Sequence, residues 1–139
     1  MSKLKALDEN LILNDKRVIL RVDFNVPMQN GEITDKSRIV KVIPVIKELT
    51  KKKAKVILIS HIGRPNGKID EKLSLKPLVP ILETLINSKI HFFNKSFGPT
   101  VIEKSNKIKP GELLLLENIR FHKEEELNEV SFAKELSKI

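Results

Sequence analysis

The residues with the clearest chemical potential lie in one short segment, Ser60-His61-Ile62-Gly63-Arg64-Pro65. The imidazole of His61 and the guanidinium of Arg64 both bind phosphate, and an arginine does so through two parallel hydrogen bonds. Gly63 permits backbone conformations that other residues avoid, and Pro65 fixes its own φ angle. The segment therefore has the composition of an anion-binding loop.

Apolar runs that precede such polar loops predict a parallel sheet. Four runs have the length and the β-branched or leucine-rich character of buried strands: Lys16 to Val22, Lys55 to Ile59, Ile90 to Phe93 and Leu113 to Leu116. Apolar residues at helical spacing follow each run, within residues 39–49, 75–86, 101–102 and 130–139. This alternation predicts a three-layer α/β/α domain whose parallel sheet is covered by helices on both faces.

Right-handed crossovers would bring the carboxyl ends of all these strands to one edge of the sheet. Polar side chains follow three of the strands, namely Asp23 and Asn25, His61 and Arg64, and Arg120. Asp and Asn after a strand are also common turn formers, which is the alternative interpretation of the first pair.

Arg38 lies in the first turn of the helix that follows the first strand. A cation there opposes the helix dipole, which points to an anion-binding role, and a solvated surface arginine is the alternative interpretation. With Arg38, the edge would carry three of the five arginines. The sequence thus predicts a site for a small, highly anionic ligand.

The composition fits one globular domain of 139 residues, with 40% hydrophobic and 32% charged residues. The absence of cysteine excludes disulfides and thiolate metal sites, and it is compatible with the cytoplasm. We expect neither a secretory signal nor a membrane span, because the first ten residues contain no long apolar run and the later runs are short.

The sequence lacks the motifs of several common binding sites, namely those for nucleotides, dinucleotides and metal ions. The segment GRPNGK has three residues between its glycines and no Ser or Thr after Lys68, so it is not a Walker motif. No G-x-G-x-x-G follows a strand, and the three histidines lack metal-ligand spacing. Anion binding without an evident nucleophile or general base suits phosphoryl transfer. The net charge of +8 leaves a second class open, a non-catalytic module that binds nucleic acid or another polyanion.

Several segments in register resemble the signature segments of phosphoglycerate kinase. The longest are Arg21 to Pro27 (RVDFNVP), Ser60 to Pro65 (SHIGRP) and Leu115 to His122 (LLENIRFH). Ile33 to Ile39 and Lys109 to Glu112 match as well, and the order and spacing agree along essentially the whole chain.

The resemblance implies a cytoplasmic enzyme of glycolysis that transfers the acyl phosphate of 1,3-bisphosphoglycerate to ADP, giving 3-phosphoglycerate and ATP. Enzymes of this family have two Rossmann-like domains that close about a hinge, and they use magnesium with the nucleotide. The N-terminal domain binds the phosphoglycerate, and the C-terminal domain binds the nucleotide. Arg38 matches the arginine that stabilises charge on the transferring group, the role of a catalytic residue.

Five further positions match the family's substrate-binding residues. The resemblance implies that Asp23 and Asn25 contact the glycerate end of the substrate. It also implies that His61, Arg64 and Arg120 hold the 3-phosphate.

Because members of the family are much longer, residues 1–139 are expected to form an incomplete N-terminal domain without kinase activity of its own. No metal, Mg-ADP or Mg-ATP is expected to bind these residues, since the nucleotide domain is missing from them. Nucleic acid and membrane partners are not expected either. The parent enzyme is expected to be a monomer, whereas this piece would expose Lys16 to Val22 as a sheet edge open to self-association.

Overall fold

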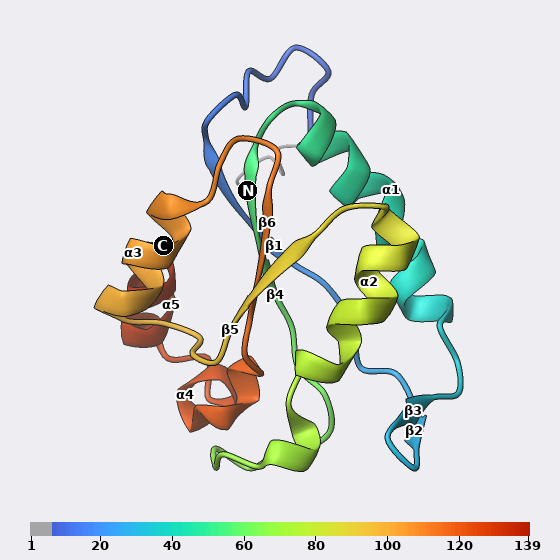
Figure 1. Cartoon of the computed structure of the whole chain (residues 1–139). Helices are drawn as coiled ribbons and strands as arrows, with labels where there is room; N and C mark the ends of the chain where they lie inside the picture. The colour runs from blue at the N-terminus through green and yellow to red at the C-terminus, as the bar shows by residue number, and fades with distance from the viewer. Residues whose placement is uncertain (1–6) are drawn as a thin grey trace.

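A sheet of parallel strands organises the computed structural model, which describes residues 7–139 (Figure 1). The strands are β1 (Arg17–Arg21), β4 (Lys55–Ile59), β5 (Ile90–Phe93) and β6 (Leu113–Leu116), in the order β1-β4-β6-β5. All four strands predicted from the apolar runs are confirmed. Residues 1–6, which belong to the predicted domain, lie outside the described residues.

Helices cover both faces of the sheet, which confirms the α/β/α architecture. On one face lie α1 (Ser37–Lys51) and α2 (Val79–Ile86), and on the other lie α3 (Pro99–Lys107) and α5 (Val130–Leu136) (Figure 1). Short turns of helix complete the fold: η1 (Glu71–Leu73), η2 (Lys76–Leu78), η3 (Ile119–Phe121) and α4 (Lys123–Glu126).

Alternate strand residues supply two separate cores. In β6, Leu113 and Leu115 pack in the core beneath α1 and α2, whereas Leu114 and Leu116 pack in the core beneath α3 and α5. All four leucines are buried. A strand that is buried on both faces must be apolar throughout, which is why four consecutive leucines predict a strand here.

Two features differ from the prediction. One is a small hairpin of β2 (Met28–Gln29) and β3 (Glu32–Ile33), whose strands the sequence did not predict. Val130, expected on the apolar face of the last helix, is 69% exposed. The chain reverses at Asn128, whose φ is +53°, so Val130 begins a separate short helix that buries Phe132 instead.

In the described part of the chain, β1 pairs with β4 alone and lies at one edge of the sheet, as predicted. None of the helices found between residues 7 and 139 has the length and apolar character needed to cross a bilayer.

An aromatic cluster attaches the last helix to the rest of the domain. The ring of His122 lies 4.6 Å from that of Phe97 and 5.8 Å from that of Phe132, measured between centroids. Burial lowers the pKa of His122 from its ordinary value, and the nearby Glu124 carboxylate opposes this shift only in part. The cluster therefore favours a neutral imidazole.

The stability of the domain should fall as the pH is lowered below about 6.5, the ordinary pKa of histidine. In that range the unfolded chain binds a proton at residue 122 that the folded chain resists, so acid favours unfolding. Urea denaturation at pH 7 and pH 5 measures the loss, and His122→Phe should reduce it while preserving the aromatic packing. The matched control is His91→Gln, at an exposed histidine outside the cluster. An equal loss in wild type and His122→Phe would contradict the prediction.

Candidate functional site

The loops that follow β1, β4 and β6 meet at one edge of the sheet because these strands are parallel and in register. The amide of Val22 donates to the carbonyl of Ile59 at 3.0 Å, which continues the β1–β4 pairing past the end of β1. The amide of Ile119 donates to the carbonyl of Ser60 at 3.1 Å, which joins the β4 and β6 loops. The predicted convergence of polar segments is therefore present.

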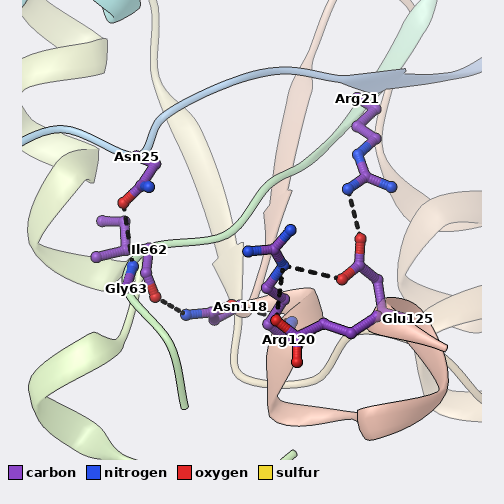
Figure 2. A network of polar contacts seen from close by, with 8 residues as sticks. Arg21, Asn25, Ile62, Gly63, Asn118, Arg120 and Glu125 are labelled. Carbon is purple, nitrogen blue, oxygen red and sulfur yellow. Dashed lines mark hydrogen bonds and ion pairs between the residues drawn. The ribbon is translucent and has the colours of Figure 1, made fainter. Parts of the chain in front are cut away.

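Two side chains join the β1 loop to the β4 loop. The buried hydroxyl of Ser60 accepts a hydrogen bond from the amide of Phe24 at 3.0 Å. Asn25 Oδ1 accepts one from the amide of Gly63 at 3.1 Å (Figure 2). Gly63 has φ of +64°, a conformation that favours glycine, and a Cβ there would lie 2.7 Å from Leu73 Cδ2 and displace that side chain. Asn25 thus fixes the course of the loop that carries His61 and Arg64.

The buried amide of Asn118 joins three backbone segments of the site. Its Nδ2 donates to the carbonyls of Ile62 and Leu73, both at 2.9 Å. Its Oδ1 accepts from the amide of Arg120 at 3.0 Å. The sequence prediction did not include this residue, although a polar side chain directly after a buried strand is a usable signal.

Glu117, its neighbour, is a buried carboxylate with every bond directed at the backbone or at a hydroxyl. Its oxygens accept from the amides of Leu75 and Asn118 at 2.9 and 2.8 Å, and from the hydroxyl of Ser74 at 2.7 Å. It fixes the segment that leads into α2. Its hydrogen bonds indicate a structural role.

Arg38 lies beside the two polar residues of the β1 loop, as the sequence predicted. Its Nη1 is 3.3 Å from Asp23 Oδ2 and 3.0 Å from the carbonyl of Asn25. The side chains of Arg38 and Asp23 are 54% and 59% exposed. An ion pair so exposed contributes little to stability and yields readily to a ligand.

Arg120 is held more firmly. Its Nε lies 3.0 Å from Glu125 Oε2, and Glu125 Oε1 forms an ion pair with Arg21 Nη2 (Figure 2). Glu126 Oε1 is 3.7 Å from the same Nε. Arg21 and Glu125 were absent from the predicted site. Arg21 offered one signal, an arginine as the last residue of a strand, whereas no local pattern marks Glu125.

His61 lies within the electrostatic reach of this group. Burial lowers its pKa, and the positive charge of Arg120 adds to that effect. The charges of Glu125 and Asp23 act in the opposite direction, and Arg21 lowers the pKa further. A half-buried, neutral imidazole beside two guanidinium groups is suited to hydrogen bonding with an anion.

Arg64 forms no hydrogen bond or ion pair with the other predicted residues that the structure describes. It is exposed, and it makes no ion pair or side-chain hydrogen bond with the residues that the structure describes. It follows Gly63 on the braced loop. Its position leaves the guanidinium available to a ligand.

The arrangement offers cations and hydrogen-bond donors. Between residues 7 and 139 no group of three or more His, Asp or Glu side chains is placed to hold a metal ion. A cavity of about 930 Å³ opens nearby between Ile69, Phe93 and Phe121, but none of the six predicted residues lines it. The six predicted residues therefore lie outside this cavity, at the carboxyl edge of the sheet.

Comparison with known proteins identifies the family. The family model described as phosphoglycerate kinase matches residues 8–139. The chain belongs to the phosphoglycerate kinase family. This confirms the resemblance of the RVDFNVP, SHIGRP and LLENIRFH segments.

Curated relatives match over nearly the whole chain. The phosphoglycerate kinase of Leptospira biflexa is 49% identical over 137 residues, covering 99% of this chain and 34% of the relative. That of Moorella thermoacetica is 48% identical over 139 residues, covering 100% of this chain and 35% of the relative. The chain thus spans about a third of the length of these relatives.

Solved phosphoglycerate kinases share the fold. The structure from Pyrococcus horikoshii OT3 superposes with a TM-score of 0.82 at 32% identity, covering 94% of this chain and 34% of that one. The structure from Coxiella burnetii gives the same TM-score at 39% identity, covering 94% and 32%. The predicted Rossmann-like architecture is confirmed over that third of the family's length.

Replacing Asn118 with alanine should lower the free energy of unfolding by about 2–4 kcal/mol, because two carbonyls lose their common donor. Urea denaturation measures the change. Asn94→Ala, at an exposed asparagine after β5, is the control and should alter stability little. Equal stability of Asn118→Ala and wild type would show that the bridge does not hold the loops.

Proposed function

We propose that this chain provides the phosphoglycerate-binding part of a phosphoglycerate kinase. The enzyme would transfer the acyl phosphate of 1,3-bisphosphoglycerate reversibly to ADP, giving 3-phosphoglycerate and ATP in glycolysis. The observation that carries the proposal is the gathering of Arg38, His61 and Arg120 at the carboxyl edge of the sheet in a chain of this family.

The substrate would lie across the edge of the sheet. In this proposal Asp23 and Asn25 contact its glycerate end, and His61, Arg64 and Arg120 bind its 3-phosphate. The position of His61 supports this assignment, because the charge of Arg120 reaches its imidazole and contributes to its lowered pKa, which places the two groups near each other.

Arg38 would act on the transferring phosphoryl group. Phosphoryl transfer spreads negative charge over the equatorial oxygens, and a guanidinium placed there stabilises the transition state. The weak, exposed pair between Arg38 and Asp23 supports this role, because the arginine moves to the substrate at little cost.

Nucleotide and magnesium would bind elsewhere. In the proposal, Mg-ADP and Mg-ATP occupy a second domain that accounts for most of the family's remaining length. The parent enzyme would be a cytoplasmic monomer without nucleic acid or membrane partners. The 139-residue chain alone would self-associate through the β1 edge.

We expect the chain to bind 3-phosphoglycerate, and Arg64→Ala or Arg120→Ala to weaken binding by about 1.5–3 kcal/mol, the scale of a charged hydrogen bond. Isothermal titration calorimetry measures the affinity. Arg17→Ala is the matched control, since Arg17 is an exposed arginine at the opposite end of β1. Unchanged affinity in both site variants would refute the assignment.

The 139-residue chain should form no ATP from ADP and 1,3-bisphosphoglycerate, because the proposed nucleotide site lies outside it. A coupled assay of the purified chain tests this, with a full-length relative as the positive control. Turnover by the chain alone would disprove the division of roles. Salt-dependent binding to random-sequence DNA without competition from 3-phosphoglycerate would instead favour the polyanion-binding module.

A further inference from the structure

Glu125 is a buried carboxylate to which the proposed function assigns no role. Its side chain is 6% exposed, although it lies in α4, a short surface helix. Each of its oxygens meets a different arginine, Oε1 that of Arg21 and Oε2 that of Arg120 (Figure 2). A buried carboxylate is costly unless it is paired, and here two guanidinium groups provide the pairing.

The contact sets the relative position of two distant segments. Arg21 ends β1, Arg120 lies in η3 after β6, and Glu125 joins them across the edge of the sheet. Without the carboxylate, two neighbouring cations would repel each other and separate. Glu125 therefore determines the positions of both guanidinium groups.

Only one side of the Arg120 guanidinium is used by this contact. Glu125 and Glu126 both approach Nε, and no hydrogen bond or ion pair reaches Nη1 or Nη2 from the residues that the structure describes. Figure 2 shows these terminal nitrogens directed away from Glu125. A guanidinium held by Nε presents its terminal nitrogens as a fork that matches two oxygens of a phosphate.

The backbone of Arg120 is fixed by other groups. Its amide donates to Asn118 Oδ1 at 3.0 Å, and its carbonyl accepts from the amide of Gly67 at 3.3 Å. Loss of the Glu125 carboxylate would therefore leave the side chain of Arg120 with only the longer contact to Glu126, at 3.7 Å, while its main chain stays in place.

We propose that Glu125 is a positioning residue that orients the terminal nitrogens of Arg120 toward the phosphate of the bound substrate. The inference rests on the proposed function for the identity of that substrate. The direction in which Glu125 changes the affinity for the anion decides between two roles. A carboxylate that merely repels the anion would weaken binding, whereas a positioning carboxylate strengthens it.

The contact itself is tested without any ligand. The Nε–H signal of Arg120, assigned by its loss in Arg120→Lys, should exchange slowly with water in the wild-type chain. In Glu125→Gln it should exchange faster by about tenfold or more, the scale of one lost charged hydrogen bond. Glu124→Gln, which removes the same charge from the same helix but from a residue paired with neither arginine in the described structure, should leave the signal unchanged. Equal exchange in wild type and Glu125→Gln would overturn the inference.

Binding tests the consequence. Calorimetric titration with 3-phosphoglycerate, and separately with inorganic phosphate, should give affinities about tenfold weaker in Glu125→Gln than in wild type or Glu124→Gln. In an Arg120→Ala background the same substitution should add less than about a twofold loss, since it acts through that arginine. Unchanged or tighter binding by Glu125→Gln, or an undiminished loss in the Arg120→Ala background, would overturn the inference.

Two further arms separate the possible failures. Glu125→Asp keeps the charge and shortens the reach by one methylene, so weaker binding supports positioning and unchanged binding contradicts it, even where Glu125→Gln fails to fold. If wild type binds phosphate but not 3-phosphoglycerate, the proposed substrate is wrong while the phosphate titrations still decide the role of Glu125. If it binds neither, both proposals fail.

Discussion

The candidate site depends on the requirement that buried polar groups be fully hydrogen-bonded. Asn118 and Glu117 follow directly after an entirely buried strand, where an unpaired amide or carboxylate would be severely destabilising. Their hydrogen bonds go to the backbone of the β4 loop, to the segment before α2 and to the amide of Arg120. No buried side-chain nitrogen or oxygen in the described structure lacks a partner. The loops of the site are therefore held in place by two polar side chains that are anchored at the end of the buried strand β6.

The arginines at this edge differ in how firmly they are held. Arg120 meets a buried carboxylate, Arg38 an exposed one, and Arg64 contacts neither. A ligand would find one oriented cation and two that adjust to it. Such a division suits a ligand that is anchored through one phosphate, since the oriented guanidinium loses little freedom on binding.

The sequence predicted the strands and the gathering of loops because each rests on a simple rule. Strands buried on both faces are continuously apolar, and parallel strands share one carboxyl edge. The β2–β3 hairpin escaped prediction because its strands have two residues each and little apolar pattern. The roles of Arg21 and Glu125 escaped because they arise from a contact between distant positions. Sequence spacing identifies which residues reach an edge, whereas side-chain packing decides which of them pair.

The contact between Arg21 and Glu125 spans 104 positions in the sequence. Parallel pairing of β1 with β4 already requires a long crossover, and contacts at such separations form only after much chain entropy has been lost. Closing this contact therefore orders a long stretch of chain between β1 and α4. A ligand that binds Arg120 together with the β1 loop would connect these two parts and raise the free energy needed to separate them. Such a ligand would link residues about a hundred positions apart and so stabilise the domain as a whole.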